Sequence, residues 1–296
     1  MILTDLSTLS RLHFRILEKL SPKTASRKAV QLWLTPPVYK ATVPEKLDIE
    51  SASLKRVPFS GSAYQASVES FYTFYEWGEG PTILLVHDWG GAAAQMAPLA
   101  RSLAEAGYRV VAFDALAHGD SPGKQTDLVE MTDVIRDIGK MNSGFHAVIA
   151  HSVGSIAAIV AIQQGLQTDS VVLMNAAASI DYYLHQFAAG LRASRQTMGR
   201  ISFYINTQLK RNIKDFSIIN IVPGLNVPAL IIHDENDELV AHSEAVALSK
   251  LWRDSTLFST AGLGHDGVLR DQEAAARIIG FMGRRQEAVA GGLTSG

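Results

Sequence analysis

The sequence predicts an α/β fold in which helices cover both faces of a mostly parallel central sheet. Short apolar runs bounded by glycine, proline or polar residues recur along the chain, and helical patterns separate them. Such runs are typical of buried parallel strands, whose two faces are both covered. The predicted strands are residues 81–86, 108–114, 147–151, 170–174, 228–233 and 256–258, and the predicted helices are 96–106, 128–141, 153–164, 243–252 and 272–282.

The two ends of the chain differ from this core. Residues 1–45 have apolar positions at helical spacing, broken once at Ser21-Pro22 and ended by Pro36-Pro37, which predicts a helical arm. Its apolar face needs a partner, either the body of the protein or a second subunit in a homodimer. Residues 286–296 are expected to form a flexible tail.

Residues 46–285 are expected to form one domain that contains the parallel core. In the segment 47–77, aromatic and polar residues alternate in short runs, which predicts antiparallel strands ahead of the parallel sheet. An insertion at about 179–223, between two core strands, is rich in aromatic and aliphatic residues mixed with arginine and lysine. Such residues at helical spacing form either the core of the insertion or the lining of an apolar pocket.

The composition narrows the range of functions. The 296 residues are 47% hydrophobic, enough to bury one large core. A formal net charge of −2 gives no general affinity for nucleic acid or anionic membrane. With no cysteine, the chain has neither disulfides nor a thiol nucleophile. The amino terminus lacks the pattern of a signal peptide, and no apolar stretch suits stable membrane insertion, so we expect a cytoplasmic protein.

One apolar strand ends at a serine flanked by small residues. Residues 147–157 read Ala-Val-Ile-Ala-His-Ser-Val-Gly-Ser-Ile-Ala, with an apolar helix following. This is the layout of a nucleophile elbow, in which a serine occupies a strained strand-to-helix turn and the residues two before and two after it must be small. Here those residues are Ala150 and Gly154, and the serine is Ser152.

Polar loops follow three other predicted strands. The run 81–86 ends in His87-Asp88-Trp89-Gly90-Gly91, the run 228–233 leads into Asp234-Glu235-Asn236-Asp237, and the run 256–258 leads through Gly262-Leu263-Gly264 to His265. Serine, acid and histidine therefore follow one another in chain order, each after a predicted strand. Together with 114–121, which is similar to D-x-x-G-x-G-x-S with Ala117 in place of glycine, these motifs resemble those of the α/β-hydrolases over about residues 65–285.

The residues and the resemblance together imply a serine esterase. A serine hydroxyl needs a base to take its proton, for which neutral histidine is suited, and an acid to orient that base. Ser152 is the expected nucleophile, His265 the base and Asp237 the acid. The elbow geometry makes the Val153 amide one oxyanion donor, and the resemblance makes the Trp89 amide the other. Because a neighbouring carboxylate raises the pKa of His265 while burial lowers it, we expect a value near neutrality.

Alternatives accompany several of these residues. Asp181, after the strand 170–174, is a rival acid, and the acidic cluster around Asp237 is alternatively a solvated loop. His87, His118 and His151 are expected to be structural or turn-forming and not catalytic. A metal is not expected, because no zinc-site spacing such as H-E-x-x-H occurs, and no cofactor is expected, because no phosphate-binding loop has the required context.

The predicted function is cleavage of a small-molecule carboxylic ester. His87, Phe187 and Phe203 are candidate residues of the substrate pocket. Thioester, lactone and acyltransfer chemistry use the same triad and remain alternatives. So does a non-catalytic binding protein, because Asp88, Ala117, Ala150 and Asp234 stand where the family usually has glycine.

Overall fold

The computed structural model describes residues 8–62, 64, 70–208 and 213–293. Its central sheet has the strand order β1-β2-β4-β3-β5-β6-β7-β8. The strands are β1 (Ser53–Pro58), β2 (Phe71–Trp77), β3 (Thr82–Val86), β4 (Arg109–Asp114), β5 (Ala147–His151), β6 (Val171–Met174), β7 (Ala229–Asp234) and β8 (Ser255–Thr260). Strands β3 to β8 pair in parallel, whereas β2 pairs antiparallel with both β1 and β4. The α/β fold with a mostly parallel sheet is therefore confirmed.

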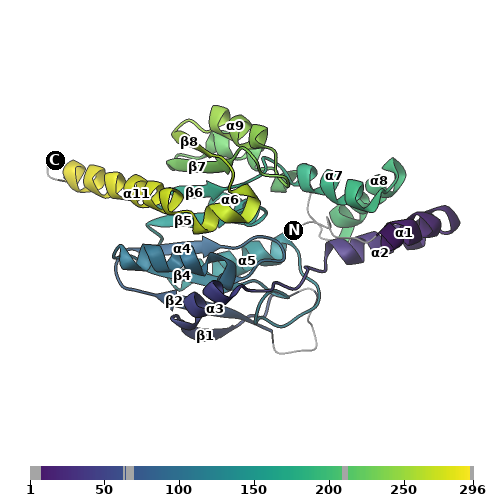
Figure 1. Ribbon diagram of the computed structural model, residues 1–296, viewed down its shortest axis with the longest axis horizontal. Coiled ribbons are helices and arrows are strands. Elements are labelled where there is room, and N and C mark those ends of the chain that lie inside the picture. The colour runs from purple at the N-terminus through teal and green to yellow at the C-terminus, as the bar shows by residue number, and fades with distance from the viewer. Residues whose placement is uncertain (1–7, 63, 65–69, 209–212, 294–296) are drawn as a thin grey trace.

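Helices cover both faces of this sheet (Figure 1). Alternate strand residues point to opposite faces, so Leu84 and Val86 pack on one side while Ile83 and Leu85 pack on the other. The first face is covered by α5 (Leu128–Lys140), α6 (Gly154–Gln163) and α9 (His242–Leu251), and the second by α4 (Ala93–Glu105) and α11 (Gln272–Leu293). Because both faces are buried, these strands read as continuous apolar runs in the sequence.

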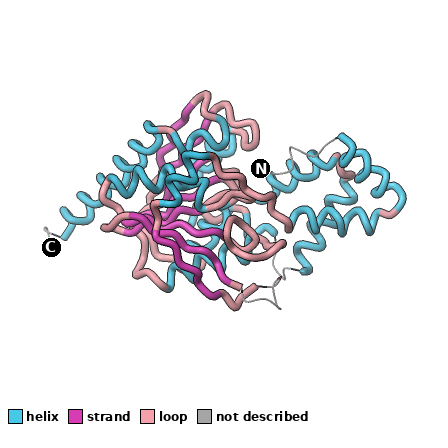
Figure 2. The backbone as a smooth tube through the Cα atoms, turned by 60° about the horizontal axis from the view of Figure 1, so that its bottom comes forward, coloured by secondary structure: helices cyan, strands magenta, loops and turns pink. Residues whose placement is uncertain are grey.

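A lobe of four helices lies at one end of the molecule (Figures 1 and 2). The helices are α1 (Thr8–Leu20) and α2 (Pro22–Trp33) from the arm, and α7 (Ile180–Leu191) and α8 (Arg195–Gln208) from the insertion. The Trp33 and Phe187 rings meet edge to face with centroids 5.2 Å apart, and the Ser194 amide donates to Glu18 Oε1 at 2.9 Å. The arm therefore packs against the insertion of its own chain.

The insertion returns to the sheet through short 3₁₀ turns. These are η1 (Ile213–Phe216), η2 (Ile218–Asn220) and η3 (Val222–Gly224), after which β7 begins. Ile218 and Val222 are fully buried, so this return segment joins the core that lies under α6 and α9.

Two expectations about the ends of elements are wrong. Residues 47–50 belong to helix α3 (Val43–Glu50), because Thr42 and Glu45 form a capping box at its start. Helix α11 continues to Leu293 and so includes most of the expected flexible tail (Figure 1). The first seven residues of the arm and the last three of the chain lie outside the described residues.

Helix α6 begins in very close contact with the end of β3. A methyl group added at Gly154 would overlap the carbonyl oxygen of His87 and lie 3.0 Å from Val86 Cγ1. The turn after Ser152 therefore requires glycine two residues later for space, since backbone cannot move aside as a flexible side chain can.

We predict that Gly154→Ala lowers the free energy of unfolding by about 1–3 kcal/mol, the usual cost of overpacking a core. The matched control is Gly199→Ala in α8, where an added methyl group meets nothing within 4 Å. Helix propensity should make that control neutral or stabilising by up to about 1 kcal/mol. Urea unfolding measures both variants, and an equal change in the two would contradict the close approach.

Candidate active site

Ser152 occupies a strained turn between β5 and α6. Its φ of 50° lies in the left-handed region, which residues other than glycine rarely adopt. The turn is held by the Ser152 amide, which donates to the carbonyl of Met174 at 2.9 Å. The side chain is 2% exposed and stands at the start of α6, where helical N–H groups favour negative charge.

His265 connects Ser152 with an acid. It lies in α10 (Gly264–Gly267), directly after the loop that leaves β8, and its Nε2 is 2.9 Å from Ser152 Oγ. Its Nδ1 is 2.7 Å from Asp237 Oδ2. The carboxyl ends of parallel strands meet at one edge of a sheet, which brings these residues together from positions far apart in the chain.

Asp237 is a fully buried acid at the end of β7. Its Oδ1 accepts hydrogen bonds from the amides of Leu239 and Val240 at 2.8 and 3.0 Å, so Oδ2 is aimed at His265. Burial alone would raise the pKa of the Asp237 carboxyl, but His265 and the two amides hold it below its ordinary value. Asp181 is instead exposed in the first turn of α7, so the structure pairs His265 with Asp237.

The acidic loop after β7 is not simply a solvated surface. Asp234 is fully buried, and its carboxylate accepts four hydrogen bonds from the two loops of the site. The donors are the amides of Asn236, Leu263 and Gly264 and the hydroxyl of Thr260, at 2.8–3.0 Å. Asp234 therefore positions both the acid and the histidine.

Two further residues, Asn175 and His151, hold the loop that carries His265, and sequence reasoning did not find these contacts. Asn175, just after β6, donates through Nδ2 to the carbonyls of Gly264 and His265 at 3.1 and 2.8 Å, and His151 Nε2 lies 3.0 Å from the His265 carbonyl. Asn175 also has a φ of 49°. The sequence did offer one signal for Asn175, namely an asparagine directly after a buried strand, because asparagine tolerates the left-handed backbone conformation.

Two carboxylates face His265. Asp88 Oδ2 lies 3.7 Å from Nε2, on the side opposite Asp237. Burial alone would lower the pKa of His265, but its hydrogen bond with Asp237 and the nearby carboxylate of Asp88 raise it to about 9. The expected value near neutrality is wrong, because it counted one carboxylate only.

The two amides expected to form an oxyanion hole do converge on one point. The Trp89 amide donates to Asp88 Oδ1 at 2.6 Å, and the Val153 amide donates to the same oxygen at 3.1 Å. That oxygen belongs to a side chain that is 3% exposed. The sequence marked Asp88 only as a departure from glycine, so its position in the site is a finding of the structure.

His87 supports the loop that follows β3, and it does not line the pocket described below. Its Nε2 accepts a hydrogen bond from the Ala115 amide at 3.0 Å, which leaves Nδ1–H to donate to the Asp88 carbonyl at 2.7 Å. Burial lowers the pKa of His87 to about 4, and it lowers that of the neighbouring His118 to about 3. Both rings are therefore neutral near pH 7.

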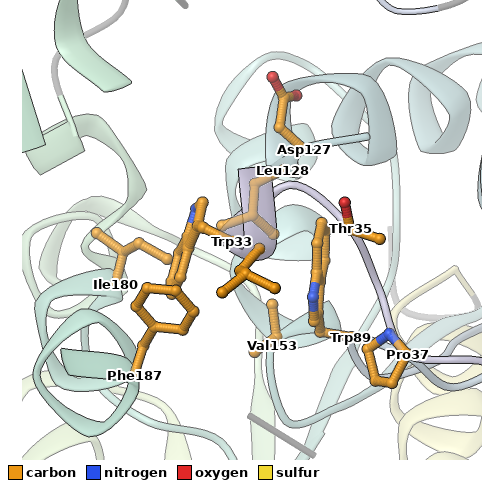
Figure 3. Close-up of a pocket in the computed structure, with 10 residues that line it drawn as sticks. Trp33, Thr35, Pro37, Trp89, Asp127, Leu128, Val153, Ile180 and Phe187 are labelled. Atoms are coloured by element: carbon orange, nitrogen blue, oxygen red, sulfur yellow. The ribbon is translucent and has the colours of Figure 1, made fainter. Parts of the chain in front are cut away.

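A small apolar cavity of about 40 Å³ opens over Trp89 and Val153 (Figure 3). Its lining comes from the arm, the insertion and the body, and consists of Leu32, Trp33, Thr35, Pro37, Trp89, Asp127, Leu128, Val153, Ile180 and Phe187. Phe187 is one of the residues that line this cavity. Phe203 does not, because it is 69% exposed on α8.

Tyr183 adds a hydroxyl to the site. It is buried on α7, and its Oη lies 3.4 Å from Ser152 Oγ and 3.3 Å from the Ala177 amide that donates to it. Sequence reasoning treated this tyrosine only as part of the insertion. No sequence signal distinguished it from Tyr182, which contacts the Leu239 carbonyl instead.

The described residues include one set of side chains that could hold a metal ion. Ligand atoms of Asp88, His151 and His265 lie within 4.8 Å of one another. The ring nitrogens of His265 already contact Ser152 and Asp237. A metal would therefore compete with the serine for Nε2.

Comparisons with known proteins agree with the observed fold. Residues 80–217 match the family model described as "Serine aminopeptidase, S33". A curated protein of Variovorax paradoxus (strain S110), named "Putative carbamate hydrolase RutD", is 29% identical over 103 residues. That match spans 33% of this chain and 39% of the relative's length.

Solved structures share the fold at low sequence identity. The thioesterase domain from the curacin biosynthetic pathway is 15% identical, with a TM-score of 0.57 over 78% of this chain and 99% of that one. The meta-cleavage product hydrolase from Pseudomonas fluorescens IP01 is 18% identical, with a TM-score of 0.58 over 82% and 99%. The chain has the α/β-hydrolase fold, and these matches support a hydrolase. Among the described residues, no helix has the length and apolar content needed to cross a membrane.

We predict that the His265 imidazole keeps its proton until about pH 9. Its pKa is raised above that of the unfolded chain, so its charge stabilises the fold fully below about pH 6.5 and this contribution is lost as the pH rises through 9. NMR titration of the ring should show this midpoint, with a lower one in Asp237→Asn. His118 is the internal control and should not titrate in the same range. A wild-type His265 midpoint near neutrality would contradict the effect of two carboxylates.

Proposed function

We propose that this protein is a serine hydrolase that cleaves carboxylic esters with small acyl groups. The observation that carries the proposal is the continuous hydrogen-bonded chain from Asp237 through His265 to Ser152. A buried serine at the start of a helix, next to a histidine oriented by a buried acid, is the arrangement that activates a hydroxyl for attack on an acyl carbon.

The proposed reaction has two steps. Ser152 Oγ attacks the acyl carbon while its proton passes to His265 Nε2, and collapse of the tetrahedral intermediate breaks the ester C–O bond, with His265 giving the proton to the departing alcohol. Water then attacks the acyl-enzyme by the same route, releasing the acid and restoring Ser152. Asp237 holds Nδ1–H of His265 throughout, and the amides of Trp89 and Val153 are the proposed donors to the oxyanion.

The pocket suggests the size of the substrate. About 40 Å³ is room for a short aliphatic group, because a single water needs about 10–15 Å³ by the same measure. The lining is apolar apart from Thr35 and Asp127. A short, uncharged acyl or alkoxy group therefore fits better than a long lipid chain.

Related acyl chemistry uses the same residues. The names of the similar proteins refer to a carbamate hydrolase and a thioesterase, so carbamates and thioesters are the alternatives to test beside simple esters. The cytoplasmic location stays a prediction, as does a homodimer through the arm or the insertion.

We predict that Ser152→Ala abolishes both fluorophosphonate labelling and turnover of short-chain p-nitrophenyl esters while the protein stays folded. Loss of a triad residue typically removes several orders of magnitude in rate, because serine and histidine act as one unit. Tandem mass spectrometry of the labelled peptide should place the label on Ser152 in the wild type. Equal turnover in the purified variant, or no reaction of the wild type at any pH, would overturn the proposal.

The same assay shows whether Asp237 or Asp181 is the acid that orients His265. Asp237→Asn should slow turnover by about 10⁴, because the amide favours the wrong histidine tautomer. Asp181→Asn is the matched control and should leave the rate near that of the wild type, since Asp181 is exposed and away from His265. A large loss in the control instead would assign the acid to the loop after β6.

We predict that Phe187→Ala shifts the preference of the protein toward longer acyl chains. It removes one wall of the pocket beside Val153, and each methylene in such a pocket is worth roughly 1–3 kcal/mol. Phe203→Ala is the matched control, because this exposed phenylalanine of α8 lies outside the pocket. kcat/KM for esters of two to eight carbons measures the shift, and identical profiles for the two variants would show that the pocket does not hold the acyl group.

A further inference from the structure

The amides of Trp89 and Val153 already have an anionic partner. Both donate to the same oxygen, Asp88 Oδ1, at 2.6 and 3.1 Å. Two backbone N–H groups aimed at one oxygen beside a nucleophilic serine are the geometry of an oxyanion hole. The carboxylate of Asp88 therefore stands where the oxyanion of a reacting acyl group would stand.

The other oxygen of the same carboxylate points to the base. Asp88 Oδ2 lies 3.7 Å from His265 Nε2, the nitrogen that is 2.9 Å from Ser152 Oγ. A bound carboxylate in this position resembles the charge of a tetrahedral intermediate, because it spans the oxyanion hole and the imidazolium together. Its charge also favours the protonated form of His265, which is unable to accept a proton from Ser152.

The main chain of Asp88 has hydrogen-bond partners other than its own carboxylate. The Asp88 carbonyl accepts hydrogen bonds from His87 Nδ1 at 2.7 Å and from the Gly91 amide at 2.9 Å. The Asp88 amide donates to Gln95 Oε1 at 3.3 Å. The backbone of Asp88 is therefore held on both sides by groups other than its own carboxylate.

We propose that Asp88 is a built-in inhibitor of the oxyanion hole, and that an acyl substrate reacts only after its carbonyl oxygen displaces the Asp88 carboxylate. This inference rests on the proposed function, since it assumes that Ser152 is the nucleophile. Displacement favours substrates whose carbonyl competes well for two N–H groups. The negative charge disfavours substrates that carry a carboxylate or phosphate near the scissile bond.

Other groups near His265 also affect its protonation. Among the residues that the structure describes, the ionisable groups that face the His265 and Ser152 side chains are Asp88, Asp237, His151, His233 and Tyr183, while Asp266 accepts a hydrogen bond from Gln95. Burial and the neighbouring His265 lower the pKa of His151 to about 4, so its ring is neutral at working pH. Within the described part of the chain, Asp88 and Asp237 are therefore the charged groups that raise the pKa of His265.

The test compares Asp88→Gly with Asp88→Asn in fluorophosphonate labelling between about pH 6 and 10, a range that brackets the His265 titration. Asp88→Gly opens the hole and removes the charge, so the plateau rate should rise at least tenfold and the pH midpoint should fall below that of the wild type. A single such donor is worth about 10²–10³ in rate, which leaves ample range for the rise. Asp88→Asn keeps a side chain that fits between the two amides, so its midpoint should fall while its plateau rises less than that of Asp88→Gly.

Two controls keep the result interpretable. The double variant with Ser152→Ala should not label, which assigns any new rate to Ser152. Asp88→Ala, whose methyl group is too short to reach the two amides, replaces Asp88→Gly if glycine destabilises the loop in urea unfolding.

The possible outcomes separate the two proposals. A plateau in Asp88→Gly and Asp88→Ala equal to or below that of the wild type, with labelling still on Ser152, overturns the inhibitor and leaves the serine hydrolase standing. No labelling of Ser152 in the wild type or in either opened variant overturns the proposed function, and this inference with it.

Discussion

The geometry of the site depends on one buried carboxylate that is not part of the hydrogen-bonded chain itself. Asp234 accepts hydrogen bonds from both loops that leave β7 and β8, at Asn236 on one side and at Thr260, Leu263 and Gly264 on the other. A buried carboxylate is stable only when such donors surround it. The two loops are therefore tied to a common point, which sets the distance between Asp237 and His265.

Burial keeps three of the histidines around the active site neutral. His87, His118 and His151 are all buried, and burial lowers the pKa of each to between about 3 and 4. They act as neutral hydrogen-bonding groups or ring contacts around one ionisable centre. His265 differs because two carboxylates face it, and this contrast makes it the group near Ser152 that changes charge at mildly alkaline pH.

The pocket joins three parts of the chain that are distant in sequence. Trp33 and Thr35 come from the arm, and Phe187 comes from the insertion. Trp89 comes from the loop after β3, and Val153 from the turn between β5 and α6. The edge-to-face contact of Trp33 with Phe187 links the first two parts, and the Thr126 amide, which donates to the Leu34 carbonyl at 2.9 Å, links the arm to the body. The arm thus supplies one wall of the pocket as well as covering apolar surface.

The sequence by itself determined the parallel sheet, the order of its helices and the position of Ser152 at a strand end, because each of these is a local pattern of apolar residues and glycines. It also named Asp237 and His265 as neighbours of Ser152, because loops after parallel strands share one edge of the sheet. Only the tertiary structure decided that Asp88 fills the point between the Trp89 and Val153 amides, that Tyr183 reaches Ser152, and that Phe203 faces solvent. Side-chain direction and the meeting of distant segments are set by packing, and local sequence patterns carry no record of that packing.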